Sequence, residues 1–135
     1  MRVLTIGSFD GVHNGHRRLF AQAGKLGELW VGVNTDRFYR EYRGYPPGYD
    51  EQHRQRQVSY QAGVKRVLLN DGPGRDLILQ VRPDVLAIGP DWMPPRDYLA
   101  QIGMTADELL SVCTLAFVGP PREPGLSSTA LKEAA

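Results

Sequence analysis

Five short apolar runs, spread along the whole chain, set the strongest limit on how this sequence can fold. They lie at residues 3–6, 29–33, 67–69, 85–88 and 115–118. Each run is too short for a helix and lacks a regular alternation with polar residues, which is typical of parallel strands covered on both faces. We therefore predict an α/β fold built on a parallel sheet of about five strands.

Segments with helical character lie between these runs. Residues 16–26 carry apolar side chains at helical spacing and are followed by Gly27, a residue that commonly ends helices. Further helices are expected at residues 50–62, 76–81 and 127–134. Strands that alternate with helices imply right-handed βαβ units. The sequence thus predicts a Rossmann-like, doubly wound sheet in a single domain that spans residues 1–135.

The composition argues against several functional classes. The 135 residues include 16 basic and 15 acidic ones, for a net charge of +1, whereas a nucleic-acid-binding surface normally needs an excess of basic residues. No apolar run approaches the roughly 20 residues of a membrane span. Cys113 is the single cysteine, which excludes an intrachain disulfide and a CxxC metal site. We expect a cytoplasmic protein that binds neither nucleic acid nor membranes.

A segment rich in glycine and histidine follows the first predicted strand. Residues 7–16 read Gly-Ser-Phe-Asp-Gly-Val-His-Asn-Gly-His. His13 and His16 are three residues apart, so that at the start of a helix both side chains can face the same side. Together with the amides of a helix N-terminus they would form a cradle for a phosphoryl group. The alternatives are a surface loop with two incidental histidines, or a zinc site, for which a third ligand is missing.

This segment resembles the GxFDxxHxGH signature of the cytidylyltransferase-like nucleotidyltransferase superfamily. The resemblance implies that His13 and His16 are catalytic, because the matching histidines contact the nucleotide phosphates and stabilise the pentacoordinate α-phosphate. It also implies that Ser8 and Phe9 contact the nucleotide through the backbone, and that Asp10 belongs to the acceptor site.

Residues 122–129 form a second candidate phosphate site. They place an arginine, which can form paired hydrogen bonds with phosphate oxygens, before a Gly-Leu-Ser-Ser-Thr run at the start of a predicted helix. The segment is similar to the RTxGISTT motif of glycerol-3-phosphate cytidylyltransferases. That similarity implies a catalytic, triphosphate-binding role for Arg122 and nucleotide contacts from Gly125, Ser127, Ser128 and Thr129. An ordinary capped helix after a proline-rich loop is the alternative.

Two further strand ends show weaker matches to the same family. Asp36 ends a segment similar to the family's STD motif and is expected to help hold the acceptor or a metal, with a capped turn as the alternative for that segment. Residues 88–92 resemble the strand-end MGDDW motif, which implies nucleotide contacts from Gly89 and Trp92. Trp92 could equally be a loop anchor that buries a large ring.

Several arginines are candidate ligands for the acceptor. Arg54 matches the arginine of the family's HR or ER pair, and Arg75 follows a glycine-rich turn, with a solvated surface position as the alternative for both. The family carries lysines in the loop after STD, whereas residues 38–45, which we expect to form a charged loop, contain none. Arg43, rather than Arg40, is expected to take that role, although a forked guanidinium does not reproduce the point charge of a lysine.

Together these matches imply that the chain is an enzyme that transfers a nucleotidyl group from an NTP to a phosphorylated small alcohol and releases pyrophosphate. CTP and glycerol 3-phosphate are the substrates that the second motif favours. Gly11-Val12 also resembles the FDGVHxGH segment of flavin and sugar-phosphate adenylyltransferases, which leaves ATP as an alternative. The missing lysines motivate a third interpretation, a non-catalytic nucleotide-binding module. The resemblance further implies Mg²⁺ on the triphosphate, without a metal site of the chain's own, and a homodimer.

Overall fold

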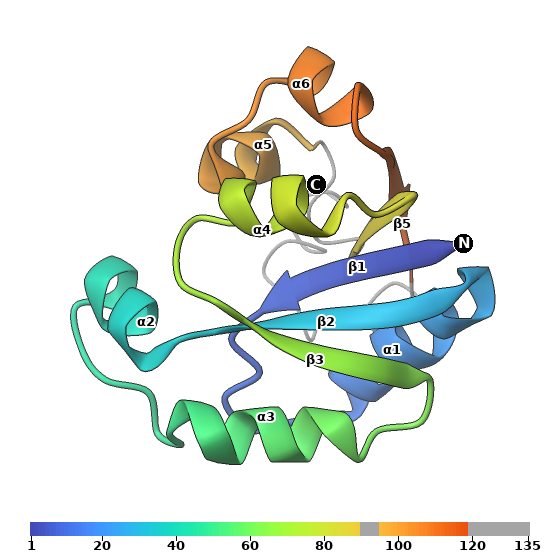
Figure 1. Cartoon of the computed structure of the whole chain (residues 1–135). Coiled ribbons are helices and arrows are strands. Elements are labelled where there is room, and N and C mark those ends of the chain that lie inside the picture. The colour runs from blue at the N-terminus through green and yellow to red at the C-terminus, as the bar shows by residue number, and fades with distance from the viewer. Residues whose placement is uncertain (90–94, 119–135) are drawn as a thin grey trace, which may run out of the picture.

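A parallel sheet forms the centre of the computed structural model, which describes residues 1–89 and 95–118 (Figure 1). In this part of the chain, five strands lie in the order β3-β2-β1-β4-β5, and every neighbouring pair is parallel. They are β1 (Arg2–Gly7), β2 (Glu28–Asn34), β3 (Val64–Asn70), β4 (Val85–Ile88) and β5 (Thr114–Phe117). The order reverses between β1 and β4, which confirms the predicted doubly wound sheet and places a switch point next to β1.

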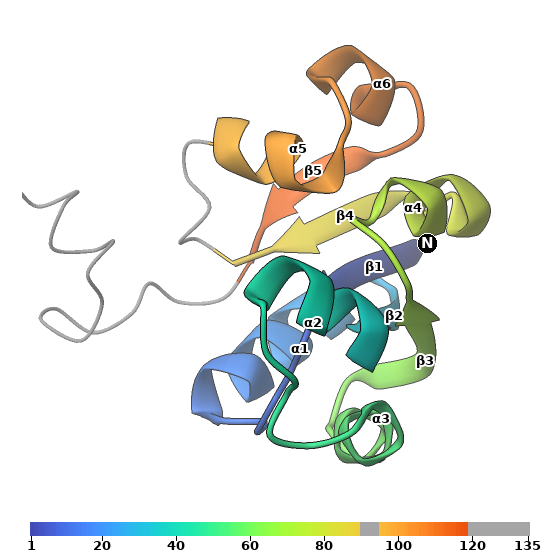
Figure 2. The same ribbon diagram turned by 90° about the vertical axis from the view of Figure 1, so that its left-hand side faces the viewer.

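Helices cover both faces of this sheet (Figures 1 and 2). On one face lie α1 (Asn14–Leu26) and α3 (Glu51–Ser59). On the other lie α4 (Arg75–Val81), α5 (Arg96–Ile102) and α6 (Ala106–Leu110). A further helix, α2 (Asp36–Arg43), follows β2 directly and lies beyond its carboxyl end.

Two apolar cores result, one on each face, because successive strand residues point to opposite sides. In β1, Val3 packs into the core under α1 and α3, while Leu4 packs into the core under α4 to α6, and both side chains are fully buried. Phe20 and Ala23 of α1 and Ile78 of α4 are fully buried in these cores. None of the helices in the described ranges is long and apolar enough to cross a membrane.

The prediction that residues 38–45 form a loop was wrong, because α2 occupies most of that segment. Thr35 caps the helix by accepting a hydrogen bond from the amide of Phe38, and Gly44 ends it with φ +84°. The segment is mostly charged and aromatic and has few apolar residues at helical spacing. The sequence pattern therefore did not indicate a helix between these two caps. The short helices α5 and α6 were likewise not predicted, whereas the helix expected at residues 127–134 lies outside the described residues.

Candidate active site

Two histidines cap the start of α1 in a reciprocal arrangement. His13 is the N-cap residue, and its Nδ1 accepts hydrogen bonds from the amides of Gly15 (3.0 Å) and His16 (3.4 Å). The Nδ1 of His16 accepts in return from the amide of His13 (3.3 Å), and the two rings stack with centroids 3.7 Å apart. Because each Nδ1 is an acceptor, the proton of each neutral ring lies on Nε2. The cap thus sets both tautomers and makes each Nε2 a donor.

Phe9 anchors the turn that carries these histidines. Its side chain is 5% exposed, and its ring lies against His16 and Phe20 with centroid distances of 5.1 Å to each. Its backbone has φ +50°, a conformation that residues other than glycine rarely adopt. A side chain on Gly7 would approach the Phe9 ring to 2.9 Å, so a glycine is needed where the ring packs on the backbone. The turn is therefore held by packing in a conformation that costs energy.

Arg54 of α3 is fully buried, and its guanidinium reaches the backbone of the same turn at Ser8. Its guanidinium donates to the carbonyl oxygens of Ser8 (2.8 Å), Asn34 (2.7 Å) and Tyr49 (2.8 Å) and to the carboxylate of Asp36 (2.8 Å). A buried charge is tolerated only when it is paired and hydrogen-bonded, and these contacts satisfy that need. The expectation that Arg54 binds the acceptor is therefore corrected, since Arg54 joins three backbone segments at the carboxyl edge of the sheet and reaches no solvent.

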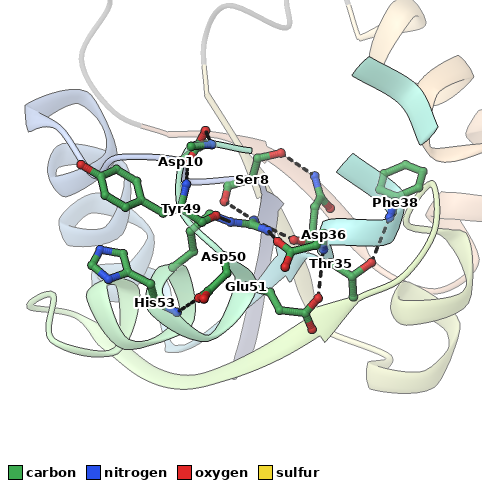
Figure 3. A network of polar contacts seen from close by, with 12 residues as sticks. Ser8, Asp10, Thr35, Asp36, Phe38, Tyr49, Asp50, Glu51 and His53 are labelled. Carbon is green, nitrogen blue, oxygen red and sulfur yellow. Dashed lines mark hydrogen bonds and ion pairs between the residues drawn. The ribbon is translucent and has the colours of Figure 1, made fainter. Parts of the chain in front are cut away.

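Asp10 fastens the turn to the segment that precedes α3. Its two carboxylate oxygens accept hydrogen bonds from the amides of Gly48 (2.8 Å) and Tyr49 (2.9 Å), as Figure 3 shows for the region around Tyr49. Tyr49 in turn stacks on His53 with the ring centroids 4.6 Å apart. Asp10, expected to contact the acceptor, is thus already engaged with backbone amides.

Asparagines at the ends of β2 and β3 continue the network toward the open side of the site. The side-chain amide of Asn70 donates to the Asn34 side-chain oxygen (2.8 Å), and the Asn34 amide donates to Ser8 Oγ (3.0 Å). Ser8 Oγ lies 2.6 Å from the hydroxyl of Tyr42. Asn34 and Asn70 are buried, so this row of polar groups joins three strand ends to α2.

These elements surround a pocket of about 420 Å³ at the carboxyl edge of the sheet. That volume lies in the range of small-molecule sites. The walls come from the turn after β1, from α2, and from α5, whose Tyr98 and Ile102 close one side. Burial, helped by the charge of Asp10, raises the pKa of Tyr39, so this phenol in the wall stays neutral.

The structure brings together six of the predicted site residues as pocket lining, namely Ser8, Phe9, Asp10, His13, His16 and Arg43. Four other predicted site residues do not line this pocket, namely Asp36, Arg54, Arg75 and Gly89. Asp36 pairs with Arg54, and Arg75 pairs with Glu108 of α6. Six predicted residues lie outside the described residues, namely Trp92, Arg122, Gly125, Ser127, Ser128 and Thr129.

The lining also contains residues that sequence reasoning missed, and these are mainly aromatic and amide side chains: Asn34, Phe38, Tyr39, Tyr42, Asn70 and Tyr98. An amide at each of two neighbouring strand ends was a signal that could have been used. The aromatic residues of α2 gave none, because their direction depends on where the helix packs.

The described part of the pocket offers Mg²⁺ few ligands of its own. Asp10 is the one carboxylate among the described residues that line the pocket, and both of its oxygens accept backbone hydrogen bonds. Within residues 1–89 and 95–118, no group of three histidine, cysteine, aspartate or glutamate side chains could hold a metal ion. Mg²⁺ commonly binds through phosphate oxygens and few protein ligands, which suits this lining.

Comparison with known proteins places the chain among nucleotidyltransferases. A family model described as cytidylyltransferase-like matches residues 4–134. FAD synthase of Korarchaeum cryptofilum (strain OPF8) is 34% identical over 104 residues, which are 74% of this chain and 71% of that protein. Bifunctional protein HldE of Aeromonas salmonicida (strain A449) is 41% identical over 98 residues, which are 68% of this chain but only 20% of HldE.

Two solved structures have a similar fold. A lipopolysaccharide core biosynthesis protein from Thermoplasma volcanium GSS1 superposes with a TM-score of 0.69 at 26% identity, over 90% of this chain and 98% of that one. A protein of unknown function from Archaeoglobus fulgidus has a TM-score of 0.65 at 22% identity, over 91% of this chain and 96% of its own, and shares the fold.

Proposed function

This chain belongs to the cytidylyltransferase-like family and is a nucleotidyltransferase, and from that premise we propose that it transfers the adenylyl group of ATP to the phosphate of a small acceptor. The observation that carries the proposal is the reciprocal cap at His13 and His16, which makes both Nε2 atoms donors beside the N-terminus of α1. Donors preorganised in this way stabilise the charge that develops on a phosphoryl group during transfer.

The choice of ATP rests on the relatives. FAD contains an adenylyl group, so an FAD synthase is a relative that adds adenylate to a phosphorylated acceptor. CTP with glycerol 3-phosphate, which the second sequence motif favours, is the other candidate. Its supporting residues, Arg122 and those at 125–129, lie outside the described part of the chain, so the support comes from the sequence resemblance alone.

The proposed reaction is a direct, in-line displacement. A phosphate oxygen of the acceptor forms a bond to the α-phosphorus, the bond from that phosphorus to the bridging oxygen breaks, and pyrophosphate leaves. The attacking oxygen is already anionic near neutral pH, so no strong general base is required. His13 and His16 would donate through Nε2 to the α-phosphoryl oxygens, and catalysis would come from positioning and charge stabilisation. Mg²⁺ would neutralise the triphosphate when bound.

Pyrophosphate release tests this proposal directly. The purified chain would be incubated with Mg²⁺ and each of the four NTPs, in the presence of flavin mononucleotide, a sugar phosphate or glycerol 3-phosphate. We expect release that requires ATP and one phosphorylated acceptor. Release with CTP and glycerol 3-phosphate would favour the second candidate. NTP binding by calorimetry without release from any pair would identify a non-catalytic binding module and overturn the proposal.

A further inference from the structure

The wall of the pocket formed by α2 contacts the turn after β1 through a pair of hydroxyl groups. The phenol of Tyr42 lies 2.6 Å from Ser8 Oγ, across 34 positions of sequence. Tyr42 is 40% exposed, so a ligand can reach it, and both residues line the pocket together with the two histidines.

This hydroxyl pair has one O–H group that can donate a hydrogen bond to a ligand. Two hydroxyl groups carry two hydrogens, and their mutual hydrogen bond uses one of them. Ser8 Oγ also accepts from the Asn34 amide, a contact that uses a lone pair and no hydroxyl hydrogen. Among the described residues neither hydroxyl has another acceptor, so one O–H of the pair remains to donate to a ligand.

Arg43 is the neighbouring charge on the same wall. Its guanidinium carbon lies 5.3 Å from the Tyr42 ring centroid, and the residue lines the pocket. Arg37 of the same helix is engaged with Glu41 and Asp71, and Arg40 does not line the pocket. Arg43 forms no ion pair within residues 1–89 and 95–118. Its side chain hydrogen-bonds the Tyr42 hydroxyl, and its remaining guanidinium N–H groups can bind an anion.

We propose that the Ser8–Tyr42 hydroxyl pair and the Arg43 guanidinium together form the subsite for the phosphate group of the acceptor. A guanidinium beside a hydroxyl donor matches the charge and the oxygen lone pairs of a phosphate monoester. This inference rests on the proposed function. It adds a tyrosine and a serine to the arginine that the sequence had already indicated for the acceptor.

Steady-state kinetics of conservative variants test the subsite. Tyr42→Phe keeps the ring and removes the hydroxyl. Because the Ser8 O–H remains but loses the partner that orients it, we expect KM for the acceptor to rise about threefold while KM for the nucleotide stays within about twofold. Arg43→Met should raise KM for the acceptor on the order of 50-fold. Arg40→Met is the matched control, because it removes the same charge from the same helix outside the pocket, and should leave both KM values unchanged.

A double variant tests whether the two hydroxyl groups act together on the acceptor. Each single variant, Ser8→Ala or Tyr42→Phe, keeps one O–H for the ligand and the double variant keeps none, so the double variant should raise KM for the acceptor by more than the product of the single changes. An increase confined to KM for the nucleotide, or a fully multiplicative double variant, would overturn the subsite.

Binding of inorganic phosphate keeps the test independent of turnover. In amide NMR spectra of the whole chain titrated with phosphate, we expect shifts at residues 42–44 that Arg43→Met abolishes and Arg40→Met leaves in place. Absence of those shifts in the unmodified chain would overturn the subsite even if transferase activity is found. Their presence in a chain without transferase activity would support the subsite and reject the proposed reaction.

Discussion

The pocket wall that carries His13 and His16 is held in place by several contacts with the rest of the fold. The wall formed by α2 contacts that first wall through few side chains. The first wall combines a reciprocal helix cap, the buried ring of Phe9, and the buried guanidinium of Arg54. The second wall is anchored by the ion pair of Asp36 with Arg54 and by the buried Tyr39, while its exposed Tyr42 contacts the first wall through one pair of hydroxyl groups. The difference separates two tasks, because a group that stabilises a transition state must be preorganised, whereas recognition of an acceptor tolerates variation.

The largest expected effect comes from removing a donor of the first wall. His16→Ala should lower kcat by about 100- to 1,000-fold, because one preorganised hydrogen bond to the transition state is lost. His13→Asn should lower kcat to a similar extent while α1 stays stable, since asparagine is a good N-cap residue. Single-turnover rates and thermal unfolding measure the two quantities separately. Turnover near that of the unmodified chain in both variants would show that neither histidine is catalytic.

The next largest effect tests how much of the first wall depends on Arg54. Arg54→Met should lower the free energy of unfolding by about 3 kcal/mol, because the carbonyl groups that Arg54 serves would be buried without a donor. Urea denaturation measures this loss. Arg56→Met, which removes an exposed arginine from the same helix, is the control and should have little effect. Equal stability of the two variants would mean that Arg54 does not hold the turn.

A smaller effect should follow from adding one methyl group beside the cap. A Cβ on residue 15 would lie 2.9 Å from Cε1 of His13, so Gly15→Ala must displace that ring. We expect kcat to fall by about tenfold through misplacement of the donor, with the fold retained. Gly72→Ala adds the same group where no atom lies within 4 Å and should leave kcat unchanged. Equal kcat in both variants would mean that the His13 position is not critical.

The smallest effect concerns the base of the second wall. Hydrogen bonds from Arg37 and from Thr35, the N-cap of α2, hold the pKa of Asp71 below its usual value. A lowered pKa in the folded state stabilises the fold above the unfolded pKa, and this contribution is lost as the pH falls through the folded pKa. Asp71→Asn should therefore be slightly less stable than the unmodified chain at neutral pH, and the difference should shrink below about pH 4. Because Asp71 is exposed, the effect is small, and a difference that is independent of pH would contradict it.

The first wall was also the easier one to predict. The spacing of His13 and His16 and the strand before them are local features, since the cap links residues at most three positions apart. Of the second wall only Arg43 was predicted, because α2 was taken for a loop and because the partner of Tyr42 is distant in sequence. Arg54 was noticed, but its role was misjudged, since an arginine on a polar helix gives no local sign of full burial.

The sequence by itself determined the strands, the parallel sheet and the histidine turn, because apolar periodicity and helix capping act over a few residues. Only the tertiary structure decided that Arg54 donates a hydrogen bond to Ser8, 46 positions away, and that Tyr42 meets Ser8 across 34 positions. The direction of such side chains depends on where α2 lies beyond the carboxyl edge of the sheet and on how α3 packs against one of its faces. That placement follows from the packing of the whole fold and from the need of buried polar groups for hydrogen-bond partners. Neither can be predicted from a short segment of the sequence.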